Sequence, residues 1–386
     1  MMRRSAPVVA VALLLLLAGF LNLARGLDHP GREYRPWALH HASYSDVIAM
    51  GGDRYLHGEH PTPYVDDRIE YPVVLGLLLW LPSWAPGGQF GHLALTSLLL
   101  ALCLVWTVRV LQRIPGANPW MLAVSPALVT YGLLNWDLVG IALLVAGMAS
   151  IERERHSGVL LGLGVATKLF PAVAFPAFLR VVRRPVGWLV AAIVAVVAVN
   201  LPFVVVAFDN WKWFFRFSSK RPPDFAVWNA LHITSVPVVN VLSLAALAVA
   251  ALVALRYGRT PTSARLSTAF VIAVWMITNK VSSPQYSLWV FAAAALVGAP
   301  WWVFGALVAG SMLDFACELW LYPRHALTLT PAVTVMVALR TAATACLAWW
   351  CLRRLRVAVA GDEGAEGGDG VGGNRAGASH GLDLPG

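Results

Sequence analysis

Apolar runs recur along almost the whole chain, and their lengths and breaks predict its architecture. Residues 7–24 form an uninterrupted apolar stretch behind Arg3 and Arg4. The stretch is long enough to cross a bilayer, and the poor cleavage site after it favours a retained span over a signal peptide. We expect further membrane segments at 89–108, 119–134, 138–150, 157–170, 172–182, 186–208, 235–256, 266–282, 285–299, 300–318 and 330–352. The pattern predicts an all-α, polytopic membrane bundle of about 12 spans.

Three of the apolar runs are too short to cross a bilayer comfortably. Residues 71–84 contain two prolines, so we expect an interfacial or re-entrant helix there. The runs 157–170 and 172–182 meet at Lys168-Leu169-Phe170-Pro171. Broken helices persist in a membrane only where their backbone is buried in protein or lines a water-filled cavity. A cavity open to the outside is therefore expected above Lys168.

Composition and charge agree with a membrane protein and assign sides to the predicted segments. The chain is 58% hydrophobic and 13% charged, which excludes a water-soluble globule. Its net charge of +9 sits in short clusters between apolar runs, which is typical of membrane orientation rather than nucleic-acid binding. With these clusters inside the cell, both termini are cytoplasmic and the active site of this plasma-membrane protein faces outward.

The same assignment of membrane segments predicts one folded domain and a tail. We expect a transmembrane domain over 1–356, with an external loop and the interfacial helix at 25–88. The Gly-rich, acidic residues 357–386 predict a disordered cytoplasmic tail. The four cysteines show no ligand spacing, so neither a zinc site nor a disulfide framework is indicated.

The external loop carries most of the candidate acid and base chemistry. Asp46 lies in HHASYSDV, and Asp66, Asp67 and Glu70 follow in PYVDDRIEYP. A carboxylate at the mouth of a membrane cavity can act as a general base toward an acceptor hydroxyl. The alternative is that these acids are solvated and pair with nearby arginines such as Arg68.

Two lysines are candidate binding sites for an anion. Lys168 lies within an otherwise apolar run, where a charge is costly and usually marks a functional site. Lys280, in MITNKVSSPQY, repeats the pattern at a helix end. Together they could flank one lipid phosphate or pyrophosphate. The alternative is a structural lysine that extends to the membrane surface.

Other polar positions allow both a structural and a functional interpretation. Asp137, after Asn135-Trp136, could cap a helix N-terminus or serve a site. The aromatic and basic loop 209–232 suits a membrane interface, a sugar or a polyprenyl chain. Arg340 falls within the last span and needs an acid, for which Asp314 or Glu318 are the available candidates. No nucleotide-binding or hydrolase motif occurs.

The ordered set of short motifs resembles a known family. The motifs SYSDV, PYVDDRIEYPVV, NWDL, ATKLFPAVAFP and NKVSSPQYSLW, behind a first span, resemble the polytopic membrane mannosyltransferases of glycosyltransferase family 87. These enzymes belong to the lipid-phosphate-sugar-dependent GT-C fold group. The resemblance runs from about residue 7 to residue 352. TKLFP is also similar to the KxxP element of eukaryotic luminal mannosyltransferases.

The resemblance implies inverting transfer of a hexose, typically mannose, from a polyprenyl-phosphate donor to a glycolipid or polysaccharide hydroxyl on the extracytoplasmic face. Asp46 matches the catalytic base by position after the first span. The donor phosphate would meet cationic and polar side chains, and other residues would shape the acceptor side. The phosphate-binding set is Lys168, Lys280, Arg68 and His232. The site-shaping set is Asp67, Glu70, Tyr71, Asn135, Asp137 and Gln285.

No metal-binding motif is evident in the first loop, so the sequence neither requires nor excludes a divalent cation. Two other functions compete with the enzyme. A transporter of lipid-linked sugars predicts polar groups at the bilayer midplane and an inverted repeat, and only Arg340 meets the first criterion. A non-catalytic cell-envelope assembly protein with the same fold would have nearly the same sequence.

Overall fold

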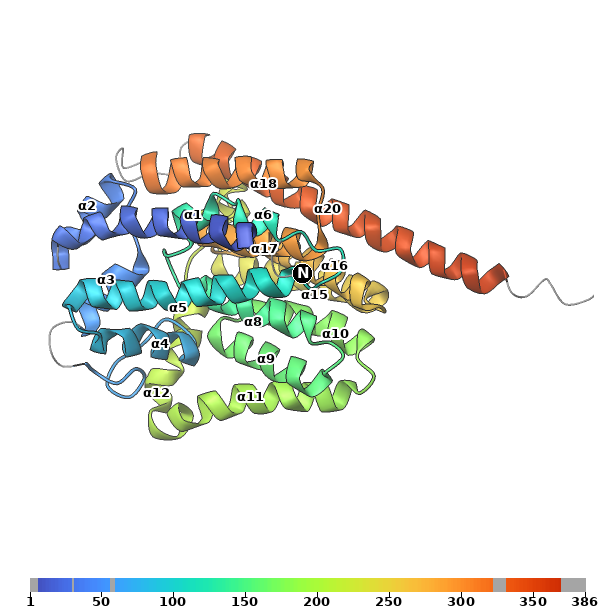
Figure 1. The fold of residues 1–386 in the computed structure, drawn as a ribbon, viewed down its shortest axis with the longest axis horizontal. Coiled ribbons are helices and arrows are strands. Elements are labelled where there is room, and N and C mark those ends of the chain that lie inside the picture. Colours follow the sequence, from blue (N-terminus) through green and yellow to red (C-terminus); the bar gives the residue numbers. More distant parts are fainter. Residues whose placement is uncertain (1–5, 30, 56–59, 322–330, 369–386) are drawn as a thin grey trace, which may run out of the picture.

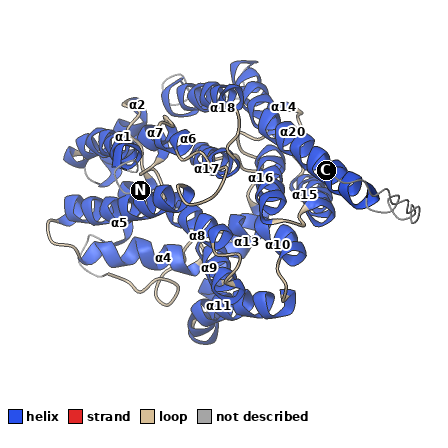
Figure 2. Cartoon of the chain, turned by 45° about the vertical axis from the view of Figure 1, so that its right-hand side comes forward, coloured by secondary structure: helices blue, strands red, loops and turns tan. Residues whose placement is uncertain are grey.

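The computed structural model describes residues 6–29, 31–55, 60–321 and 331–368, and within them the chain is helical (Figure 1). No strand occurs in these residues, and only two isolated β-bridges join loop segments. Figure 2 shows helices joined by loops throughout the described chain. The predicted all-α membrane bundle is therefore confirmed as a fold class.

Six helices are long and apolar enough to cross a membrane. They are α1 (Ala6–Ala24), α5 (Gly88–Leu111), α11 (Pro185–Val206), α15 (Val236–Tyr257), α18 (Trp301–Asp314) with its π-helical continuation η7 (Phe315–Leu321), and α20 (Pro331–Gly368). α11 and α15 carry many exposed valine and leucine side chains, as expected of helices that face lipid.

Shorter helices fill the interior between these long ones. They are α4 (Val73–Trp80) with η4 (Leu81–Trp84), α6 (Trp120–Ala123), α7 (Ala127–Tyr131), α8 (Asp137–Ala149), α9 (Glu154–Thr167), η5 (Phe170–Ala174), α10 (Phe175–Val181), α16 (Pro261–Thr278), η6 (Pro284–Tyr286) and α17 (Ser287–Val297). α8 and α17 are buried along almost their whole length, so short helices form the core.

Two of the predicted membrane segments take a more broken form. The single segment expected at 119–134 is two short helices, α6 and α7, because Pro126 has no N–H to continue the first one. The run 71–84 likewise divides into α4 and η4 around Pro82. The prediction of about 12 spans remains open, since six helices are long enough to cross a bilayer alone.

Glycines allow the short helix α9 to pack closely on the lipid-facing helix α11. A Cβ at Gly158 would lie 2.4 Å from the carbonyl oxygen of Trp188, and one at Gly162 would lie 2.3 Å from that of Ala192. The spacing is that of a G-x-x-x-G helix contact, in which missing side chains let two backbones approach. This contact holds α9, and with it Lys168 at its end, against the bundle.

The connections that the sequence predicts to be external gather at one end of the bundle. Figure 1 shows α2 (Tyr34–His40), α3 (Asp46–Tyr55) and α4 at that end, whereas the C-terminal half of α20 extends from the other end. The loop after α11 forms α12 (Phe208–Trp211), α13 (Trp213–Lys220) and α14 (Val227–Ala230). The polar motifs of the sequence lie in or beside these connections.

The C-terminal helix is longer than the sequence predicts. A disordered tail is expected from residue 357, but α20 continues through Gly368. The tail beyond this helix stays a prediction, and residues 369–386 lie outside the described residues.

Candidate active site

The SYSDV segment is fixed to the NWDL segment by hydrogen bonds between residues far apart in sequence. The Ser45 hydroxyl donates to the Leu133 carbonyl oxygen at 2.7 Å, and the Asp46 backbone N–H donates to that of Leu134 at 2.8 Å. The same serine oxygen accepts from the backbone N–H of Val47 at 3.1 Å and so satisfies a free donor at the start of α3. The Asp46 carboxylate is thereby held at a helix N-terminus.

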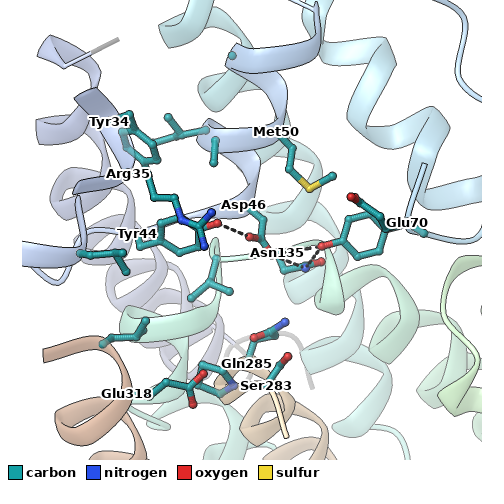
Figure 3. Close-up of a pocket in the computed structure, with 18 of the residues that line it drawn as sticks. Tyr34, Arg35, Tyr44, Asp46, Met50, Glu70, Asn135, Ser283, Gln285 and Glu318 are labelled. Atoms are coloured by element: carbon teal, nitrogen blue, oxygen red, sulfur yellow. Dashed lines mark hydrogen bonds between the residues drawn. The ribbon is translucent and has the colours of Figure 1, made fainter. Parts of the chain in front are cut away.

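The Asp46 carboxylate receives three hydrogen bonds from side chains in three separate motifs. Its Oδ1 accepts from the Tyr44 hydroxyl at 3.0 Å. Its Oδ2 accepts from the Tyr71 hydroxyl at 3.2 Å and from the Asn135 amide at 3.0 Å. Asn135 also donates to the Tyr71 oxygen at 2.9 Å (Figure 3). The network orients the carboxylate without placing a cation on it.

The two tyrosines act as donors because they hold their protons. Burial and then the charge of Asp46 raise the pKa of Tyr44, and the same two causes raise the pKa of Tyr71 well above its usual value. Both hydroxyls are therefore neutral at physiological pH and can donate to the carboxylate.

Lys168 lies immediately after α9 and is buried against one acid and a group of aromatic rings. Its ammonium contacts the Asp137 Oδ1 atom at 2.7 Å, and the Trp289 indole N–H donates to the same oxygen at 2.8 Å. The rings of Tyr71, Tyr286 and Trp289 lie 5.7–5.8 Å from the ammonium nitrogen. Asp137 is thus the partner of Lys168.

Asp46 and Lys168 line one cavity of about 740 Å³. Six of the residues predicted from sequence lie on its wall: Asp46, Glu70, Tyr71, Asn135, Lys168 and Gln285. Side chains that sequence reasoning did not select also line it, chief among them Arg35, Tyr44, Arg221 and Glu318. Figure 3 shows Asp46, Asn135 and Glu70 facing this space from separate elements.

Five predicted residues do not line the cavity: Arg68, Lys280, His232, Asp67 and Asp137. The Lys280 ammonium donates to the Ser219 carbonyl oxygen at 2.9 Å, and burial, followed by the charge of Arg221, lowers its pKa. The Arg68 guanidinium stacks over Trp213 at 5.1 Å. Arg221 therefore takes the place beside the cavity that was expected for Lys280. Its position in the loop 209–232, already notable for basic residues, was the available signal.

Among the described residues, no group of three or more His, Cys, Asp or Glu side chains could hold a metal ion. We therefore name no metal ligands. The first-loop segment 56–59, which contains His57 and Glu59, lies outside the described residues.

The model of glycosyltransferase family 87 matches residues 70–279, which is more than half of the 386 residues. The chain belongs to glycosyltransferase family 87. No curated protein and no solved structure matches the chain. The matched region includes Tyr71, Asn135 and Lys168, whereas Asp46 precedes it. Hydrogen bonding in the fold connects Asp46 to the family region. The chain is thus a membrane glycosyltransferase with an all-helical fold.

Proposed function

We propose that this family 87 protein transfers a hexose, mannose in the first instance, from a polyprenyl-phosphate donor to a hydroxyl of a glycolipid or polysaccharide. The reaction is inverting and takes place at the extracytoplasmic face of the plasma membrane. The observation that carries the proposal is one cavity that holds both a hydrogen-bonded carboxylate, Asp46, and a buried ammonium, Lys168.

Asp46 is the general base in this proposal. One of its carboxylate oxygens takes the proton of the acceptor hydroxyl while that hydroxyl oxygen bonds to the anomeric carbon of the donor. The bond between the anomeric carbon and the phosphate oxygen breaks, and the electron pair leaves with the lipid phosphate. Tyr44, Tyr71 and Asn135 keep the carboxylate in position.

Lys168 stabilises the charge that develops on the departing phosphate. An ammonium has three N–H donors, and one of them is used by Asp137. The others are available to a phosphate oxygen in the cavity that Lys168 lines. Arg221, which also lines the cavity, adds a second cation. Glu70 and Gln285 contribute polar groups for the acceptor.

The test is sugar transfer by the purified protein in liposomes, with polyprenyl-phosphate mannose and a mixed lipid acceptor extract. Asp46→Asn should reduce the transfer rate by about 100-fold to 10,000-fold, because a neutral amide cannot accept the proton. Asp66→Asn is the matched control. Asp66 belongs to the same loop, but its carboxylate accepts from the Thr62 backbone N–H at 2.9 Å and does not line the cavity.

Equal transfer by Asp46→Asn and the unchanged chain would reject Asp46 as the base. If the unchanged chain transfers no sugar from any polyprenyl-phosphate donor, the donor proposal fails. The alternatives of a non-catalytic assembly protein or a lipid-linked sugar transporter would then have to be tested directly.

A further inference from the structure

The cavity has a second polar cluster, apart from Asp46, of which the reaction above uses only Gln285. It consists of Glu318, Gln285 and Ser283, all of which line the cavity. Figure 3 shows these three side chains together in one part of the space, away from Asp46 and Asn135. We call them the Glu318 cluster.

Glu318 carries an unsatisfied acceptor. Its Oε2 atom is buried and has no hydrogen-bond partner. The neighbouring acid, Asp314, takes the ion pair with Arg340, which also donates to the Phe225 carbonyl oxygen. A buried polar atom without a partner is costly, and in native proteins such an atom often serves a function.

The local backbone places Glu318 in this position. The residue lies in the π-helical segment η7, which continues α18. Single π-helical turns are rare in proteins overall, but many of those that do occur lie at functional sites. Asp314 pairs with Arg340 and does not line the cavity, whereas Glu318, four residues later, lines it.

The chemistry of the cluster selects its ligand. The cluster offers no cation for a phosphate, whereas a carboxyl group, an amide and a hydroxyl together supply hydrogen-bond donors and acceptors for hydroxyl groups. Lys168 and Arg221 already supply cations for a phosphate in the same cavity. The Glu318 cluster therefore fits a neutral ring with several hydroxyl groups.

We propose that the Glu318 cluster is a binding subsite for the hydroxyl groups of a hexose ring, with the carboxyl group of Glu318 as its principal polar group. The inference rests on the proposed function and extends it. The hexose belongs to the donor or to the acceptor, and the kinetic experiment below distinguishes the two.

The first test measures binding without turnover. The purified full-length protein is titrated with methyl α-D-mannopyranoside and methyl α-D-glucopyranoside, and the shift of its thermal unfolding midpoint is recorded. Saturable shifts are expected for the unchanged chain and for the control Glu152→Gln, an exposed acid outside this cavity. The Glu318→Gln and Glu318→Ala variants should need about tenfold to a hundredfold more glycoside to reach half of the maximal shift in the unfolding midpoint.

The variants also report whether Glu318 is merely structural. Because the carboxylate oxygen is unpaired, its removal should leave the unfolding midpoint without ligand unchanged or raised. A lowered midpoint combined with unchanged glycoside binding would assign Glu318 to folding and overturn the proposal. Absence of any glycoside shift in the unchanged chain would overturn it too.

The second test assigns the hexose. In the transfer assay, Glu318→Gln should raise KM about tenfold to a hundredfold for one substrate, with kcat within about threefold. A raised KM for the polyprenyl-phosphate sugar places the donor hexose in the subsite, and a raised KM for the acceptor places the acceptor there. If the unchanged chain binds glycosides through Glu318 but transfers no sugar, the subsite stands and the proposed function fails.

Discussion

Two buried ion pairs of the same kind lie in different parts of the bundle. Lys168 pairs with Asp137 between α9 and α8, and Arg340 pairs with Asp314 between α20 and α18. The acids are 0% and 1% exposed and the cations 9% and 11% exposed, so the two pairs are buried to the same degree. In each acid the Oδ2 atom has no hydrogen-bond partner.

The surroundings of the cations separate the two pairs. Lys168 lines the cavity that contains Asp46, whereas neither Arg340 nor Asp314 lines it. A second donor of Arg340 is used by the Phe225 carbonyl oxygen, which ties the loop before α14 to α20. An intramembrane charge is therefore not by itself evidence of a site. What distinguishes a functional cation from a structural one is whether its N–H donors border a cavity that a ligand can enter.

Of the two ion pairs, the one with Lys168 should have the larger effect on sugar transfer. Lys168→Met should reduce sugar transfer by about 100-fold to 1,000-fold, because the departing phosphate loses its buried donor. The variant should also unfold more easily, since Asp137 is left as an unpaired buried acid. The measurements are transfer in liposomes and unfolding in detergent.

The double variant Asp137→Asn with Lys168→Met separates the two effects. With both charges removed, stability should return toward that of the unchanged chain while transfer stays low. Recovery of transfer in the double variant would show that Lys168 only balances Asp137 and has no role at the phosphate.

Substitution of Arg340 should lower the stability of the protein but leave sugar transfer nearly unchanged. Arg340→Met should lower the free energy of unfolding by about 3–5 kcal/mol, because Asp314 becomes an unpaired buried acid. Transfer per folded molecule should stay within about threefold of the unchanged chain. The double variant Asp314→Asn with Arg340→Met should regain most of the stability. A loss of transfer in this stable double variant would remove the distinction between the two pairs.

The sequence predicts the long helices better than the contacts between them. Apolar length locates α1, α5, α11 and α15, because long lipid-facing helices are a local property of the chain. The charge clusters place Asp46, Tyr71 and Asn135 on the same predicted side, but their hydrogen bonds join residues as far apart as 46 and 135. Pairing over such separations depends on helix packing, which no local pattern encodes.

The roles that the sequence does not reveal also depend on contacts between residues that are distant in the chain. The sequence leaves Asp137 open between a helix cap and a functional group, and the structure shows it as the partner of Lys168, 31 residues later. The sequence offers two acids for Arg340, and the structure pairs it with Asp314. Glu318 was considered only as a possible partner of Arg340, so its cavity position was unexpected.

The smallest effect concerns the tyrosines that hold Asp46. The pKa values of Tyr44 and Tyr71 are raised in the folded protein, whereas an unfolded tyrosine loses its proton near pH 10. Above about pH 10 the unfolded chain therefore binds fewer protons than the folded one, so stability falls as pH rises. Below that pH both tyrosines are protonated in the folded and in the unfolded chain, so they contribute no pH dependence to the free energy of unfolding.

Unfolding midpoints in detergent between pH 7 and pH 11 test this dependence. The midpoint of the unchanged chain should decline from about pH 10, and the decline should be shallower in Tyr44→Phe and in Tyr71→Phe. Tyr257→Phe is the control, since Tyr257 ends α15 far from Asp46 in sequence and does not line the cavity. An equal decline in all four proteins would mean that the hydroxyls at Asp46 ionise as freely as exposed ones. The carboxylate would then lack the neutral donors that distinguish its network from the two ion pairs.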